Sequence, residues 1–370
     1  MRIFCVADNI ISPLGTSTQD NLEAIAKGIS GVSKIADKSI SDHSFYGAKI
    51  LFEQDKIEGY SYLEALFIES IKSVIKETNI DLNKTILVLS STKGNIDLLE
   101  KGENIDQVRL SSLANKMNGY FGFLDRPLLV SNACISGVSA LLVAKKIIES
   151  GKYDHAIVSG GDLLTRFTLS GFDCLKAVSS KPCRPYDESR DGINLGEGVG
   201  TMILSNDPNL INDRDSFAEI VGGGQSNDAN HISGPSRTGA GLKLAISKAI
   251  DEAEVSINDI DYINAHGTAT LFNDEMESIA FDDLGMANIP MNSLKGYFGH
   301  TLGAAGLIES ILAVRQMNKN EVFASRGFKT QGTSRSLNIV DSNQKIKVNH
   351  SIKTVSGFGG CNAAIIFRKS

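Results

Sequence analysis

The sequence lacks the segments that mark membrane and secreted proteins. No run of apolar residues reaches the roughly 18 that a membrane-crossing helix needs, so we expect no membrane span. The apolar run at residues 1–6 is too short for a signal peptide, and Asp8 follows it closely. The five cysteines are odd in number and form no Cys-x-x-Cys pair. This pattern argues against a disulfide framework or a metal site, and it favours reduced thiols in a cytoplasmic protein.

Basic residues and linker segments are also scarce. The 37 Lys and Arg residues stand against 43 Asp and Glu residues, a formal net charge of −6 at pH 7. This balance argues against general nucleic-acid binding, although a local basic patch for an acidic partner remains compatible with it. No Pro/Ser-rich or low-complexity tract divides the 370 residues. A chain of this length can bury a large core, and we expect a compact soluble enzyme.

Apolar runs of strand length alternate with stretches of helical periodicity. Strands are predicted at residues 2–7, 85–90, 128–131, 155–159 and 199–204, and then at 217–221, 262–265, near 291–294 and at 363–367. Helices are predicted at residues 63–76, 136–150, 239–253, 274–282 and 304–317. This alternation predicts an α/β fold with mostly parallel sheets.

The chain also divides into two similar halves. A glycine-rich segment leads into a strand at residues 196–204 and again at 357–367. We therefore predict an N-terminal half, residues 1–207, and a C-terminal half, residues 208–370, with the break near 206–213.

Cys134 lies where a strand-like run gives way to a helix-like stretch. A thiol at a helix N-terminus experiences the positive end of the helix dipole, which lowers its pKa and favours the thiolate. Taken alone, a cysteine in this setting is more often part of the core, because free cysteine is among the most buried residue types.

Two of the six histidines favour a functional interpretation of Cys134, because each lies beside glycine near a predicted strand end. His266 belongs to Asn264-Ala-His-Gly-Thr-Ala-Thr270, and His300 belongs to the glycine-rich run at residues 292–306. Glycine allows the close backbone approach that functional loops need. Either histidine alone would more often be a hydrogen-bonded structural residue. Together with Cys134 they form a candidate set of one nucleophile and two imidazoles.

These residues belong to a series of short motifs that runs nearly end to end. In order, the motifs resemble β-ketoacyl synthases of the elongating, Cys-His-His kind, from the thiolase-fold superfamily of condensing enzymes. They are Asn132-Ala-Cys134, Ser159-Gly-Gly-Asp162, Arg184-Pro-Tyr-Asp187, Arg190-Asp-Gly192, Gly196-Glu-Gly198, Asn227-Asp-Ala229, Ala265-His-Gly-Thr268, Gly299-His300, Gly303-Ala-Ala-Gly306 and Gly357-Phe-Gly-Gly360. The resemblance implies a five-layered α-β-α-β-α fold of two pseudo-duplicated halves. The first half would carry the nucleophilic cysteine and the second half both catalytic histidines.

The resemblance implies a decarboxylative Claisen condensation of a Cys134-bound acyl chain with a malonyl carrier, in fatty acid, polyene or polyketide elongation. The implied partner is an acyl carrier protein. No separate cofactor is expected, because the substrates are attached to the phosphopantetheine arm of that carrier. His266 and His300 would stabilise the enolate, at roughly 3–4 kcal/mol per donor. Replacement of either histidine would then spare acyl transfer to Cys134. The backbone N–H groups of Cys134 and Phe358 would form a second oxyanion hole.

Further residues receive roles only through this resemblance. Lys295 would order the site and pair with Glu309. Outside these motifs, ordinary interpretations are a solvated lysine, strand threonines and core phenylalanines. The other implied roles are phosphopantetheine binding by Thr268 and Thr270, gating by Phe172, a place beside that gate for Asp228 and His231, and carrier docking by Lys181, Arg184, Arg190 and Arg237.

Several features depart from housekeeping members of this family. The stretch before Cys134 is shorter, Ile135 follows the nucleophile where smaller residues are usual, Cys361 replaces a common threonine, and Ser356 replaces a common aromatic residue. These departures resemble ketosynthases of specialised pathways such as aryl polyene clusters. Such enzymes often pair with an inactive homologue, so we expect a homodimer or a heterodimer with a ketosynthase-like chain-length factor.

Two alternatives remain open from the sequence. One is a non-catalytic partner subunit of the chain-length-factor type, which the presence of Cys134, His266, His300 and Lys295 disfavours. The other is a thiolase acting on coenzyme A esters with Cys361 as its base, which the two histidine motifs disfavour.

Overall fold

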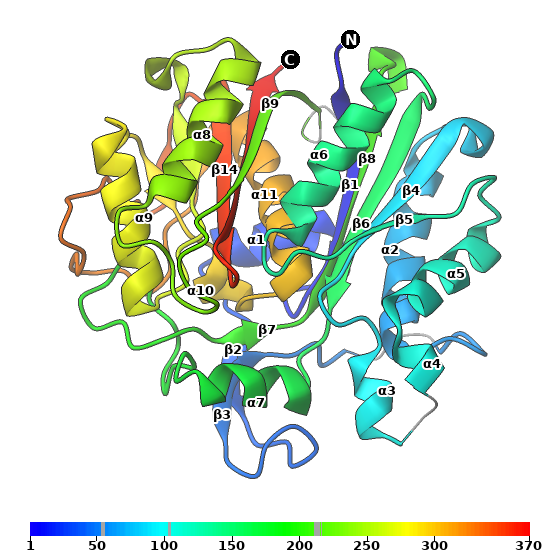
Figure 1. Ribbon diagram of the computed structural model, residues 1–370, viewed down its shortest axis with the longest axis horizontal. Coiled ribbons are helices and arrows are strands. Elements are labelled where there is room, and N and C mark those ends of the chain that lie inside the picture. Colours follow the sequence, from blue (N-terminus) through cyan, green and yellow to red (C-terminus); the bar gives the residue numbers. More distant parts are fainter. Residues whose placement is uncertain (53–55, 103–104, 211–214, 216) are drawn as a thin grey trace.

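The computed structural model describes residues 1–52, 56–102, 105–210, 215 and 217–370. Its centre is a ten-stranded sheet with the order β11-β10-β14-β15-β9-β1-β8-β6-β4-β5 (Figure 1). The strands are β1 (Phe4–Ile11), β4 (Thr85–Ser90), β5 (Leu128–Val130), β6 (His155–Asp162), β8 (Gly198–Ser205), β9 (Ala218–Asn227), β10 (Tyr262–Asn264), β11 (Met291–Asn292), β14 (His350–Gly357) and β15 (Cys361–Lys369).

The two ends of this sheet have the same topology. The first half contributes β1, β4, β5, β6 and β8, and the second contributes β9, β10, β11, β14 and β15. In both halves the third strand in sequence lies at the outer edge, followed by the second, fourth, fifth and first. The halves join where β1 pairs with β9 at Phe4–Glu219 and Cys5–Ala218. The repeated order confirms the pseudo-duplication, while the exact break stays a prediction because residues 211–214 lie outside the described residues.

The prediction of mostly parallel sheets is wrong. Within the described part of the ten-stranded sheet, parallel pairing is confined to the outer three strands of each half, β5-β4-β6 and β11-β10-β14. The inner pairings, from β6 through β8, β1, β9 and β15 to β14, are antiparallel. The periodicity of side chains identifies a strand but not its direction, since both sheet types place alternate side chains on opposite faces.

Helices cover both faces of the sheet and fill the space between its halves. The pair α2 (Tyr62–Glu77) and α5 (Leu110–Phe121) packs on the outer face of the first half, around Leu66, Phe67 and Leu87. The pair α8 (Ala240–Ala253) and α9 (Leu271–Asp283) packs on the outer face of the second half. Between them lie α6 (Ser136–Glu149) and α11 (Ala305–Lys319), which Figure 1 shows at the centre of the molecule. This arrangement confirms the five-layered α-β-α-β-α fold.

The two central helices meet at glycines near their N-termini. A Cβ on Gly137 would lie 2.5 Å from the backbone nitrogen of Leu307, and a Cβ on Gly306 would lie 2.9 Å from that of Val138. Only glycine permits such a close approach of two backbones. The start of α6, beside Cys134, is therefore held against the start of α11.

Smaller elements complete the fold at one end of the sheet, in the lower part of Figure 1. They are β2 (Val32–Ile35), β3 (Phe45–Ala48) and β7 (Leu195–Gly196), which form a three-stranded sheet, with α3 (Ile96–Glu100), α4 (Ile105–Val108) and α7 (Arg166–Cys174). Elsewhere lie α1 (Thr18–Ala26), α10 (Lys295–Phe298), β12 (Glu321–Val322) and β13 (Gln344–Lys345). Within the described residues, no helix combines the length and apolar character needed to cross a membrane.

All the predicted strands and helices overlap observed elements, but several observed elements were not predicted. The missed strand that matters most is β14, because it lies inside the sheet and its residues Ile352, Lys353 and Thr354 are buried. A lysine and a threonine inside the strand hide the apolar pattern that would indicate a buried strand.

Candidate active site

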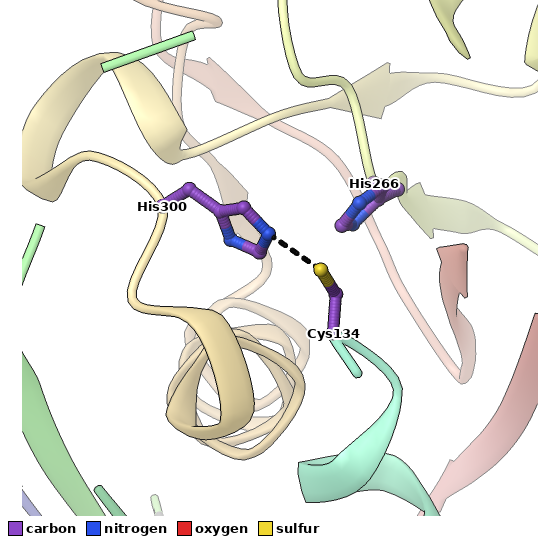
Figure 2. Close-up of side chains that lie close together, drawn as sticks. All are labelled: Cys134, His266 and His300. Carbon is purple, nitrogen blue, oxygen red and sulfur yellow. Dashed lines mark hydrogen bonds between the residues drawn. The ribbon is translucent and has the colours of Figure 1, made fainter. Parts of the chain in front are cut away.

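Cys134 occupies a tight turn between β5 and α6. Ala133 has a left-handed backbone (φ 44°), which is costly for a residue with a Cβ and is typical of functional turns. The Ser136 hydroxyl accepts the Asn132 N–H at 2.8 Å and donates to the Ala133 carbonyl at 2.6 Å, which holds this turn. The thiol is buried and faces the two histidines (Figure 2).

His300 comes from the segment between α10 and α11 and contacts the thiol directly. Its Nε2 lies 3.0 Å from the Cys134 sulfur. Its backbone N–H donates to the Asn194 carbonyl at 2.8 Å, and its own carbonyl accepts the Gly196 N–H at 3.0 Å. The Nδ1 atom of His300 is buried and has no hydrogen-bond partner among the described residues. Nothing described therefore fixes one tautomer of this ring.

His266 follows β10 and approaches the same point from the other side (Figure 2). The His266 and His300 rings lie edge to face, with centroids 5.3 Å apart and an interplanar angle of 81°. One ligand-type atom from each of Cys134, His266 and His300 lies within 4.8 Å of the other two. The Glu277 carboxylate on α9 accepts the backbone N–H groups of His266 and Gly267 at 2.9 and 2.7 Å. Residues far apart in the sequence thus converge on one sulfur atom.

Lys295 determines which nitrogen of His266 carries the proton. Its Nζ lies 3.3 Å from His266 Nδ1, 2.6 Å from the His266 carbonyl and 2.6 Å from Glu309 Oε1. An ammonium group has only donors, so Nδ1 must accept and the ring proton must lie on Nε2. The structure thus places Lys295 beside both His266 and Glu309, and the His266 Nε2–H is a donor on the side away from Lys295.

The resting Cys134 side chain is a thiol rather than a thiolate. Burial raises its pKa to about 12, with a smaller contribution from the Cys361 thiol. The Lys295 charge and the Phe358 backbone N–H lower this pKa by less than burial raises it. The expectation of a dipole-lowered pKa is therefore wrong for the resting site. Burial, followed by the Lys295 charge, lowers the pKa of both His266 and His300 well below its usual range, so both rings are neutral.

The sequence analysis missed Lys353 on β14. This side chain is fully buried, and its Nζ lies 2.6 Å from Glu309 Oε2 and 3.1 Å from the Ala265 carbonyl. Burial lowers its pKa to about 8 against the opposing effect of Glu309. The available signal was a lysine four residues before Gly357, within the β-branched segment Ile352-Lys-Thr-Val355. Glu277 and Asp274 likewise received no role from the sequence, and their carboxylates accept backbone N–H groups of residues 266–268.

A cavity of about 390 Å³ opens onto these residues. Cys134, His266 and His300 line it, together with Phe172, Phe358, Thr268, Thr270 and His231. The Phe172 and Phe358 rings stack at 5.2 Å, and the Thr268 and Thr270 hydroxyls lie 2.8 Å apart. A larger cavity of about 940 Å³, beside residues 39–62, contains none of the predicted site residues.

Other predicted residues lie outside this cavity. Asp228 accepts hydrogen bonds from the Ser236 N–H and the Asn362 side chain, both at 2.9 Å, and so ties its loop to the start of β15. Arg190, a predicted docking residue, is buried and donates to the carbonyls of Asp187 and Gly332. Its assignment to a docking patch is wrong, whereas Lys181 and Arg237 are exposed and Arg184 is half-buried.

Comparison with known proteins agrees with this geometry. Residues 80–209 match the family model of the β-ketoacyl synthase N-terminal domain, and residues 217–329 match that of the C-terminal domain. The chain is 26% identical over 408 residues to 3-oxoacyl-[acyl-carrier-protein] synthase 2 of Vibrio harveyi, covering 100% of this chain and 98% of that protein. The enzyme of the same name from Staphylococcus aureus (strain MRSA252) is 26% identical over 416 residues, with the same coverage.

Solved structures show the same thiolase-type fold. The ketosynthase ApeO, in complex with its chain length factor ApeC from Xenorhabdus doucetiae, superposes with a TM-score of 0.89 at 24% identity, covering 100% of this chain and 98% of that one. A β-ketoacyl synthase from Burkholderia phymatum STM815 gives 0.87 at 24% identity, covering 100% and 99%. With both halves of its sequence matched to the family, the chain belongs to the β-ketoacyl synthases.

Proposed function

We propose that this chain is a β-ketoacyl-[acyl carrier protein] synthase that joins a Cys134-bound acyl chain to the two-carbon unit of a malonyl carrier. The observation that carries this proposal is the contact of 3.0 Å between Cys134 Sγ and His300 Nε2, in a cavity that His266 shares. A nucleophile beside a neutral imidazole, with a second imidazole as a fixed N–H donor, suits acyl transfer followed by enolate formation.

Acyl transfer uses the neutral pair of Cys134 and His300. The thiol proton moves to His300 Nε2 as the sulfur attacks the thioester carbonyl of the acyl carrier, and it then passes to the departing carrier thiol. The backbone N–H of Phe358 donates to the Cys134 sulfur, which supports a role for this group, together with the Cys134 N–H, in stabilising the tetrahedral intermediate. Acyl transfer therefore needs His300 unprotonated.

Decarboxylation and condensation use the imidazoles as donors. When malonyl carrier loses carbon dioxide, negative charge develops on its thioester oxygen, and the His266 Nε2–H stabilises that charge. His300 can adopt the same tautomer once the thiol proton has left, because nothing described holds its Nδ1. The resulting carbanion attacks the acyl-Cys134 carbonyl, the carbon–sulfur bond breaks, and the Cys134 thiolate takes up a proton from solvent by way of His300.

The two alternatives are less well supported. A non-catalytic subunit would not need a cysteine thiol against His300 or a lysine ammonium against His266, yet both contacts are present. A thiolase would use Cys361 as a base, yet its sulfur contacts the Phe358 carbonyl at 3.4 Å and does not line the cavity. We propose that an acyl carrier protein delivers the substrates by its phosphopantetheine arm past Thr268 and Thr270, without another cofactor. All five cysteines are free thiols, which supports a cytoplasmic enzyme.

The direct test of this function is to incubate the protein with a set of acyl carriers and then with malonyl carrier. We expect mass spectrometry to find the acyl group on Cys134 and then a β-ketoacyl chain on the carrier. The preferred acyl chain will also show whether the enzyme serves an aryl polyene-like pathway. A preference for coenzyme A esters over carrier-bound substrates would contradict the proposal and favour the thiolase alternative.

We also propose that the enzyme is a dimer formed through β5. Among the described residues this edge strand pairs with β4 alone, its Leu128 is 41% exposed, and Ser131 and Asn132 beside the nucleophile are exposed as well. An apolar, unpaired edge strand is normally covered in a native protein. The ketosynthase ApeO, which has the same fold, is in complex with a chain length factor, so the partner is a second copy or such a homologue.

Introducing charge at this edge should prevent dimer formation. We expect wild-type protein to sediment as a dimer at micromolar concentration and Leu128→Asp to sediment as a monomer, because a two-fold pairing would bring two buried carboxylates together. Leu99→Asp on α3 is the matched control, since Leu99 is similarly exposed (45%) but distant from the edge. A wild-type monomer that stays monomeric when an inactive homologue is added would contradict the dimer.

A further inference from the structure

We propose that Lys353 is a positioning residue for His266, which holds the imidazole as the neutral Nε2–H tautomer from the side away from the substrate cavity. This inference rests on the proposed ketosynthase chemistry, in which that N–H stabilises the enolate. Lys353 does not line the cavity, so it cannot contact the substrate without a rearrangement of the site.

Two chains of contacts connect Lys353 to His266. The first runs through the backbone, because Nζ donates at 3.1 Å to the carbonyl of Ala265, whose peptide bond leads directly into His266. The second runs through side chains, because Nζ lies 2.6 Å from Glu309 Oε2, and Glu309 Oε1 accepts from Lys295 at 2.6 Å. Lys295 in turn contacts His266 Nδ1 at 3.3 Å. One ammonium group therefore controls both the position of the His266 backbone and the group that fixes its tautomer.

Stability alone does not explain this lysine. Lys353, Lys295 and Glu309 are all fully buried, and one carboxylate lies between two ammonium groups. Lys295 by itself would neutralise Glu309, and burying a further charge costs free energy that an apolar side chain at position 353 would avoid. A buried excess of positive charge next to a reaction site is more typical of function than of packing.

The excess charge acts on both imidazoles. The charged and titratable groups that face Lys353 are Glu309 on α11, Lys295 on α10, Glu277 on α9 and the rings of His266 and His300. Glu277 is engaged with the backbone N–H groups of His266 and Gly267, and it does not offset the two ammonium charges at Glu309. The charge of Lys353 lowers the pKa of both histidines, in addition to burial and Lys295. Both rings therefore stay neutral, as the proposed acyl transfer and enolate steps need.

The test compares Lys353→Met with Lys353→Arg and with Lys145→Met. Methionine fills the space without charge, arginine keeps the charge, and Lys145 is a matched control that is also buried and paired with glutamates, at the far end of α6. We expect Lys353→Met to lower malonyl decarboxylation roughly 10- to 100-fold, the range for losing a hydrogen bond to a charged group. In Lys353→Met the loss of the nearby positive charge raises the pKa of His300. The acid limb of the pH–rate profile for acyl transfer therefore moves to higher pH. Lys353→Arg should keep the acid limb near that of wild type, and Lys145→Met should leave both measurements unchanged.

A second measurement does not depend on catalytic activity, and its main result comes from the wild-type protein. In wild-type protein labelled with ¹⁵N-histidine, the chemical shifts of Nδ1 and Nε2 of His266 should be those of the Nε2–H tautomer. Followed as a function of pH, these shifts should show an inflection near pH 8, where Lys353 loses its proton. That inflection should be absent in Lys353→Arg. A His266 signal without the inflection, or a Lys353→Met variant with wild-type rate and pH profile, would overturn the inference. A wild-type protein that never condenses substrates would instead contradict the proposed function, and the histidine signals could still be read.

Discussion

Cys134→Gln is expected to reduce condensation to background while malonyl decarboxylation continues. The acyl chain loses its only covalent attachment point, so no carbonyl is available for the carbanion to attack. Decarboxylation depends on the donors of His266 and His300, which this substitution leaves in place. In wild-type protein, peptide mapping should find acylation at Cys134 alone, because only this thiol both lines the cavity and contacts an imidazole.

The matched control is Cys361→Ala, which removes the neighbouring buried thiol without removing the nucleophile. Cys361 lies on β15 with its sulfur against the carbonyls of Phe358 and Asn132, so we expect acylation and condensation to continue in this variant. Its loss should lower the pKa of Cys134 slightly, because Cys361 is one of the groups that raise it. Acylation found on Cys361 in place of Cys134 would contradict the ketosynthase mechanism and support a thiolase-like one.

His266→Ala and His300→Ala are expected to lower decarboxylation by about 10²–10³ each, the usual loss for one oxyanion donor. The rate of acyl transfer should differ between the two variants, although the sequence predicted one role for both histidines. His266→Ala should leave acyl transfer largely intact. His300→Ala should impair it, because Nε2 of His300 lies 3.0 Å from a thiol whose pKa is raised to about 12 and accepts its proton.

The pH dependence of alkylation tests the same difference. Without His300, reaction of Cys134 with iodoacetamide should rise about tenfold per pH unit between neutral pH and 10, because the thiolate fraction grows in that proportion below a pKa of about 12. In His266→Ala the profile should stay close to that of wild type. His155→Ala is a suitable control, since His155 on β6 is buried against Ser205 and does not line the cavity. Equal acyl-transfer rates in both active-site variants would show that the proton acceptor lies elsewhere.

Local sequence was sufficient to predict the elements that carry the site. The strand at Thr85–Ser90 was predicted with both ends correct, and the helix after Cys134 differs from α6 by one residue. Their apolar periodicity arises from faces buried in one core, so each can be read over a short window. The ordered glycine, histidine and cysteine motifs likewise indicated the family and the residues that line the cavity, because the chemistry needs these residue types on specific loops.

Tertiary structure alone decided how these elements are combined and how the groups behave. Strand direction follows from the paths of the connections, and β14 was missed because Lys353 interrupts its apolar pattern. The protonated state of Cys134 follows from burial beneath segments that are distant in sequence, which raises its pKa to about 12. The different roles proposed for His266 and His300 follow from which ring nitrogen contacts Lys295 and which contacts the Cys134 sulfur. Sequence periodicity reports which face of an element is buried, whereas desolvation and hydrogen-bond partners depend on what the rest of the chain places against that face.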